Sequence, residues 1–149
     1  MRANVYVRHS FFSAVQFGSV GDYRLWAGDG WLHDNDDKQH TWAGHVAKLR
    51  FKIDFIKHDL LLDIDMIPHV ARGVEQELYV FINGAFVAFW PILNAGVQSA
   101  RIETTFLQPG DWLMTFLMPK AICPRDLGVS QDQRTLGVAF RSLSLSQAK

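Results

Sequence analysis

The sequence of 149 residues has one cysteine, no excess of either charge, and no apolar run long enough to span a membrane. Its 15 Lys and Arg residues balance 15 Asp and Glu residues, which removes the general attraction to phosphate backbones or anionic lipids. With 48% hydrophobic residues, the chain does not belong to the disordered class. We therefore expect one globular domain over residues 1–149, with no nucleic-acid partner and no membrane span.

The single cysteine and the interrupted apolar stretch at the start of the sequence both bear on the cellular compartment to be expected. Cys123 cannot form an intrachain disulfide, and Arg2, Arg8 and His9 interrupt the stretch where a signal peptide needs continuous apolar residues. The expected location is the cytoplasm. The five prolines occur singly, and no linker or internal repeat divides the chain.

Alternating apolar and polar residues predict several β-strands. The period of two that is typical of a half-buried strand occurs at 47–53, 60–66 and 138–145. If the first two strands pair antiparallel, the outward side chains of Arg50 and Lys52 face Asp63 and Asp65 across the ladder. Shorter strands are expected at 5–7 and 14–17.

A tight hairpin is the strongest local signal. Asn83-Gly84 separates the apolar runs 78–82 and 85–90, and it supplies the two positive φ angles of a type I′ turn. A second hairpin is expected from 100–104 and 112–118, around the turn residues 108–111. Helical periodicity is weak throughout. The fold class predicted is all-β, a two-sheet antiparallel β-sandwich that is jelly-roll-like and has little helix.

A series of motifs adds a resemblance that covers nearly the whole chain. In order, it consists of Phe17-Gly18-x-x-Gly21, Gly30-Trp31, Trp42, Ile82-Asn83-Gly84 and Pro124-x-x-Leu127-Gly128-x-Ser130-x-Asp132-x-Arg134-x-Leu136-Gly137. The series resembles the small β-sandwich accessory modules that accompany bacterial glycosyltransferases and other surface-polysaccharide proteins. This resemblance implies a jelly-roll-like, non-catalytic module in a carbohydrate setting. It does not name a ligand.

The segment 29–42 is the first candidate for a ligand site. Sugars present C–H faces that stack on aromatic rings and hydroxyls that bond carboxylates, so tryptophan and aspartate in one loop suit such a ligand. The alternative is structural: the two tryptophans close one end of the sandwich, and the acidic residues form turns. The candidate residues are Trp31, Trp42, Asp29, Asp34 and Asp36.

Asp132 and Arg134 are a second candidate pair. At a spacing of two in an extended segment, both side chains point to the same face. They either pin the connection to the last strand or line a polar pocket for hydroxyl groups.

Metal and cofactor chemistry find little support. Asp34, Asn35, Asp36 and Asp37 offer oxygen ligands for calcium, but the glycine and the distant glutamate of an EF-hand loop are missing. The six histidines lack the spacing of a transition-metal site. No nucleophile elbow or phosphate-binding loop occurs. We expect no metal and no cofactor, and calcium stays a minor alternative.

Aromatic residues crowd the predicted hairpin. Tyr79 and Phe81 alternate with Val80 and Ile82, so one face of the hairpin needs a cover other than the core on its opposite side. This pattern favours a homo-oligomer or docking to a larger protein. The resemblance above implies that such a larger protein is glycosyltransferase-associated.

The sequence thus leads to one hypothesis and two alternatives. The hypothesis is a non-catalytic module that binds carbohydrate or supports a polysaccharide-building protein. The first alternative is an assembly protein that binds another subunit through the hairpin face. The second is a sugar-active enzyme, which needs two carboxylates about 5–10 Å apart and has only the aspartates of segment 29–42 to supply them.

Overall fold

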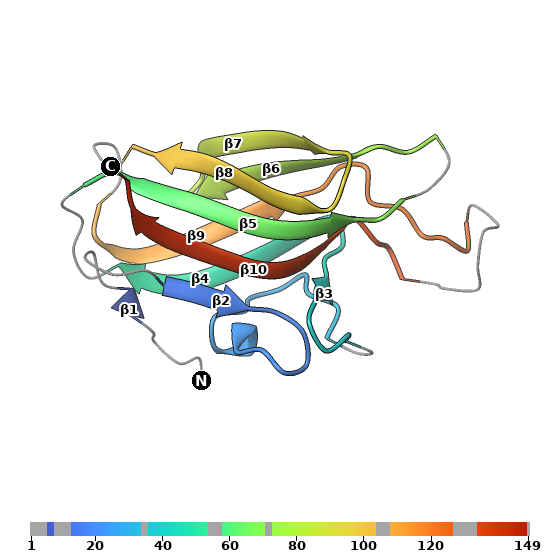
Figure 1. The fold of residues 1–149 in the computed structure, drawn as a ribbon, viewed down its shortest axis with the longest axis horizontal. Helices are drawn as coiled ribbons and strands as arrows, with labels where there is room; N and C mark the ends of the chain where they lie inside the picture. The colour runs from blue at the N-terminus through green and yellow to red at the C-terminus, as the bar shows by residue number, and fades with distance from the viewer. Residues whose placement is uncertain are drawn as a thin grey trace.

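The computed structural model describes residues 6–7, 13–33, 36–53, 58–70, 73–103, 108–126 and 134–148. These residues form two five-stranded sheets packed face to face, which confirms the predicted two-sheet sandwich (Figure 1). One short 3₁₀ helix, η1 (Tyr23–Leu25), occurs in the described part of the chain. The pairing is antiparallel except between β1 and β4.

Sheet A contains the predicted hairpin. Its order is β1 (Tyr6–Val7), β4 (Val46–Ile53), β9 (Gly110–Leu117), β6 (Gln76–Ile82) and β7 (Ala85–Ile92). Sheet B has the order β2 (Ser13–Gln16), β10 (Val138–Gln147), β5 (Leu60–Pro68) and β8 (Gly96–Ile102), and β3 (Thr41–Trp42) also pairs with β10.

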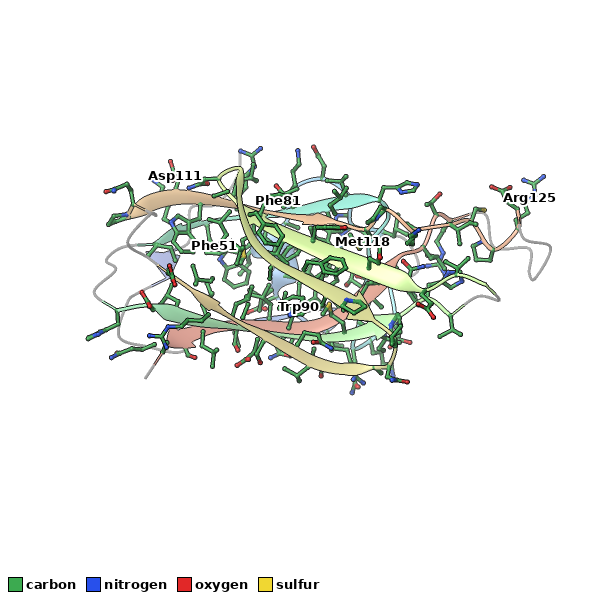
Figure 2. The ribbon with its side chains drawn as sticks, turned by 90° about the horizontal axis from the view of Figure 1, so that it is seen from above. Phe51, Phe81, Trp90, Asp111, Met118 and Arg125 are labelled. Carbon is green, nitrogen blue, oxygen red and sulfur yellow. The ribbon has the colours of Figure 1, made fainter. Side chains whose placement is uncertain are left out.

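The core lies between the two sheets and follows the alternation in the sequence. In β5, every second residue from Leu60 to Pro68 is buried, and β6 repeats the pattern from Gln76 to Ile82. Trp112 is 1% exposed. Figure 2 shows Phe51 and Trp90 between the two layers, where Phe51 is buried and Trp90 packs against the core.

Two predicted strand pairings are wrong. Strands β4 and β5 belong to different sheets, so Arg50 and Lys52 do not face Asp63 and Asp65. Strands β8 and β9 are also in different sheets and form no hairpin. The physical reason is the same in both cases: alternation fixes which residues are buried, but it does not fix which neighbour a strand pairs with. Lys52 instead lies 3.6 Å from Asp111 of β9.

The predicted hairpin is confirmed. Asn83 and Gly84 have φ angles of 51° and 84°, which are the positive values that a type I′ turn requires. The pairing of β6 with β7 shifts register between Val80 and Phe81, which marks a β-bulge. Within the described part of the chain, no helix is both long and apolar enough to cross a membrane.

Candidate functional site

Trp31 lies in the core and not on the surface. Its side chain is 5% exposed, and its ring lies 5.1 Å from that of Phe17 and 5.0 Å from that of Phe140, measured between centroids. Its indole N–H donates a hydrogen bond of 2.8 Å to the carbonyl of Lys48. Trp31 therefore joins the two sheets at one end of the sandwich, the position that the structural alternative expects.

Trp42 occupies a different environment on β3. It is half-buried, and the rings of His40 and His69 meet it edge-on at centroid distances of 5.9 and 6.0 Å. Trp31 and Trp42 thus do not form one aromatic pair, although the same loop carries both.

Asp36 of the 29–42 loop belongs to a cluster with Tyr23, His33 and Arg24. The hydroxyl of buried Tyr23 donates to Asp36 Oδ2 at 2.6 Å. The hydroxyl oxygen of Tyr23 lies 2.7 Å from Nδ1 of His33. Since the hydroxyl proton is already donated to Asp36, His33 Nδ1–H is the donor and the Tyr23 oxygen the acceptor. Arg24 approaches the carboxylate at 3.7 Å. Burial, followed by the bond to Asp36, raises the pKa of Tyr23 above its ordinary value.

The backbone at the start of the loop is fixed to β4. Lys48 N–H donates to the carbonyl of Asp29 at 2.9 Å, and Gly28 N–H donates to that of Lys48 at 2.8 Å. Gly30 has a φ of 98°, and a side chain there would collide with the carbonyl of Val46. The Asp29 side chain is exposed to solvent.

The other predicted residues divide between described and undescribed parts. Asp34 and Asp132 lie outside the described residues, as does most of the motif around Asp132. Arg134 is half-buried and interacts with other groups. Among the described residues, no group of three or more His, Cys, Asp or Glu side chains is placed to hold a metal ion.

The outer face of sheet A carries a cluster of two exposed and two half-buried rings, which we call the aromatic face: Phe86 and Phe89, and Tyr79 and Phe81. Tyr79 pairs with Phe89 across β6 and β7, with ring centroids 4.6 Å apart. Phe81 pairs with Phe86 at 6.0 Å. Phe86 is 60% exposed and Phe89 is 39% exposed. The bulge keeps both pairs on the same side of the sheet.

Strand register extends this face across the sheet. Tyr79 is followed on β9 by Leu117 and on β4 by Val46, which is 38% exposed. The neighbouring row continues from Phe81 through Thr115 to Lys48. The row through Tyr79 thus stays apolar as far as Val46 on β4, whereas the row through Phe81 becomes polar at Thr115 and basic at Lys48.

An open pocket of about 740 Å³ lies at one end of the aromatic face. It is lined by the segments 73–77 and 119–122. The second of these segments leads to Arg125, which Figure 2 shows at one end of the molecule. Glu77 lines the pocket and precedes Tyr79 by two residues on β6, so both side chains point to the same face. Glu75 and Lys120 add further charged groups. A bond of 3.2 Å from the side chain of Gln76 to the carbonyl of Lys120 ties the two segments together.

Sequence reasoning identified the crowded hairpin but missed this pocket. The alternation of Tyr79 and Phe81 was a signal for a face that needs a cover. Glu75, Glu77 and Lys120 gave no signal, because Lys120 is at least 43 residues from the two glutamates in sequence and meets them only in the folded sheet.

No protein-family model matches the chain, and no curated protein matches its sequence. Solved structures do match in fold. The C-terminal CBM6 of LamC, a laminarinase from Zobellia galactanivorans, aligns with a TM-score of 0.52 and 8% identity over 92% of this chain and 100% of that chain. A ruminal GH26 endo-β-1,4-mannanase aligns with a TM-score of 0.54 and 11% identity over 96% of this chain and 27% of that chain.

The same sandwich also occurs in a protein of another kind. The mosquito-larvicidal toxin Cry4Aa from Bacillus thuringiensis aligns with a TM-score of 0.51 and 9% identity, over 98% of this chain and 25% of that chain. The chain thus spans about a quarter of the mannanase and of the toxin, and the whole length of the LamC module. At these identities the similarity concerns the fold.

Proposed function

We propose that this chain is a non-catalytic carbohydrate-binding module that binds glycans on the aromatic face of sheet A. The observation that carries the proposal is the pair of cross-strand ring contacts, Tyr79 with Phe89 and Phe81 with Phe86, on the solvent side of the sheet. The LamC module, which has a similar fold and aligns over its whole length, is of the carbohydrate-binding class, and this supports the assignment.

Ring faces on a sheet suit sugars for a physical reason. A pyranose ring has apolar C–H faces, and burial of these faces against a phenyl or phenol ring removes both from water. The rings are paired across β6 and β7 and already contact one another, so they lose little conformational freedom when a glycan binds.

The pocket beside the aromatic face supplies groups for the hydroxyls of the glycan. Carboxylates accept hydrogen bonds from sugar hydroxyls, and an ammonium group donates to them. Glu77 lines the pocket and lies on the same face as Tyr79, so one glycan can contact a ring and a carboxylate together. We also propose that this module assists a polysaccharide-building enzyme. The support for this part of the proposal is the series of motifs from Phe17 to Gly137 that resembles accessory modules of such proteins.

The test combines a glycan array with calorimetry. We expect saturable binding to at least one oligosaccharide, with one site of this kind per chain. Replacement Phe86→Ala removes a ring that is 60% exposed, and it should weaken binding about tenfold, or about 1.4 kcal/mol, while the free energy of unfolding changes by less than about 1 kcal/mol.

The matched control is Val97→Ala, which removes another exposed apolar side chain, on β8 of the opposite sheet. It should leave affinity unchanged. A folded wild-type protein that binds no glycan on the array contradicts the proposal, and so does a Phe86→Ala variant with unaltered affinity. Trp42→Ala and Asp29→Asn test in the same assay whether the 29–42 loop contributes.

A second candidate function is assembly with another subunit through the same face. The specific observation is the continuation of the aromatic row into Leu117 and Val46, which makes the face apolar beyond the four rings. A subunit interface needs only the apolar surface. A glycan site also needs polar side chains that hydrogen-bond the sugar hydroxyls, and here these are Glu77 and Lys120. Glu77→Gln therefore separates the two: it weakens glycan binding and leaves an apolar interface intact.

A further inference from the structure

A groove of about 400 Å³ lies on the opposite side of the molecule, on the outer face of sheet B. It runs over β2, β10 and β5, which lie side by side in Figure 1. From the 29–42 loop, Gln39 lines the groove. The main lining residues are Gln16, Val20, Gln39, Asp65, Arg141 and Ser142.

A bulge in β10 directs two successive side chains into this groove. In a regular strand, Arg141 and Ser142 would point to opposite faces, but the pairing of β10 with β5 shifts register between Phe140 and Ser142. Both residues line the groove as a result. Bulges that redirect a side chain are frequent beside binding sites.

Hydrogen bonds from the backbone N–H groups of Gly18 and Ser19 fix the segment that carries Gln39. Ser19 N–H donates to the carbonyl of Asp37 at 2.8 Å, and Gly18 N–H donates to Oγ1 of buried Thr41 at 2.9 Å. A side chain at Gly18 would collide with the carbonyl of Lys38, so the two segments are in close contact there. These contacts bring Gln39 to the edge of the groove.

The polar groups of the groove balance in charge. Arg141 Nη2 donates to Asp65 Oδ1 at 2.8 Å, and the two side chains are 37% and 29% exposed. Arg141 Nε is buried and makes no hydrogen bond among the described residues. Gln16, Gln39 and Ser142 add uncharged donors and acceptors around the ion pair.

We propose that this groove is a second ligand site, which takes a neutral polyhydroxylated ligand such as a sugar ring with adjacent hydroxyls. Each sugar hydroxyl both donates and accepts, so one accepts from the guanidinium of Arg141 while its neighbour donates to the carboxylate of Asp65. A charged ligand would instead have to break that ion pair. The volume lies within the range of about 300–1,000 Å³ that small-molecule sites occupy.

This inference goes beyond the proposed function, because it places a site on the opposite sheet that uses hydrogen bonds and not ring stacking. It does not depend on the aromatic face. The full chain is labelled with ¹⁵N and titrated with methyl α-mannoside and methyl α-glucoside, which differ only in the orientation of the hydroxyl at C2, beside that at C3. Glycerol serves as the control polyol.

We expect one glycoside to shift the amide resonances of Gln16, Gln39, Asp65 and Ser142 in a saturable way, and to bind more tightly than the other. Ser142→Ala and Gln39→Ala should each weaken that binding about threefold to tenfold. Gln39 is exposed and Ser142 is half-buried, so both variants should remain folded. Phe86→Ala should leave this binding unchanged.

Three results overturn the inference. One is the absence of saturable shifts in the groove with either glycoside. Another is an equal response to glycerol, which would indicate an adventitious additive only. The third is a shift pattern centred on Phe86 and Phe89 that Phe86→Ala abolishes, which would support the proposed function alone. Loss of the aromatic site with an intact groove would overturn the proposed function alone.

Discussion

At the scale of single residues, the cluster of Tyr23, His33 and Asp36 makes stability depend on pH. The pKa of Tyr23 is raised in the folded state, by burial first and then by its bond to Asp36. The folded protein therefore retains this proton more tightly than the unfolded chain does. Stability from this group is present below the ordinary tyrosine pKa of about 10, and it is lost as pH rises through the higher folded value.

The prediction compares wild type with Tyr23→Phe in urea unfolding between about pH 8 and pH 11. The variant should be less stable at pH 8, because Asp36 loses a hydrogen bond inside the protein. Its free energy of unfolding should then fall less steeply above pH 10 than that of wild type. Equal slopes in the two proteins would show that Tyr23 does not cause the alkaline loss.

Residue types in the 29–42 loop predicted polar and aromatic chemistry, but not the environment of each side chain. Trp31 and Trp42 have the same sequence signal, yet one is a core residue and the other is half-buried beside two histidines. The difference arises from contacts with Phe17, Phe140 and His69, which are distant in sequence. No local pattern contains that information.

At the scale of elements, the β6–β7 hairpin is fixed to β9 through its turn. Asn83 accepts a hydrogen bond of 2.8 Å from the N–H of Leu113 with its side-chain oxygen, and its amide donates to the carbonyl of Asp111 at 3.2 Å. The backbone N–H of Asn83 also donates to the carbonyl of Leu113 at 2.9 Å. The turn residue therefore connects two hairpin strands to a third strand.

Asn83→Ala should lower the free energy of unfolding by about 1–3 kcal/mol, since it removes both side-chain bonds and a residue that tolerates positive φ. The control is Asn94→Ala in the exposed turn between β7 and β8, which should change stability by less than about 0.5 kcal/mol. Chemical denaturation measures both. An equally small change in the free energy of unfolding at both positions would mean that the bonds of Asn83 to β9 do not stabilise the hairpin.

The sequence was sufficient to predict individual strands and the type I′ turn, because these depend on neighbouring residues. It was insufficient for the pairing of β4 with β9 and of β5 with β10 and β8. The expected opposite charges do meet across strands, but as Lys52 with Asp111 and Arg141 with Asp65. Long-range pairing depends on how the two layers pack, and alternation is the same in either sheet.

At the scale of the whole molecule, the outer face of sheet A is the surface on which both candidate functions, carbohydrate binding and subunit assembly, depend. Light scattering over a wide concentration range distinguishes these uses. If the face serves glycans, we expect a monomer whose mass does not change with Phe86→Ala. A dimer that Phe86→Ala dissociates, and that glycans do not affect, would favour the assembly function.

The central claim is that the four rings of the aromatic face bind a glycan. Calorimetric titration of wild type and Phe86→Ala with the strongest ligand from a glycan array tests it most directly, after circular dichroism has shown that both proteins are folded. The account predicts saturable binding to wild type and about tenfold weaker binding to the variant. Equal affinity in the two proteins, or no heat of binding to the wild type, would contradict it.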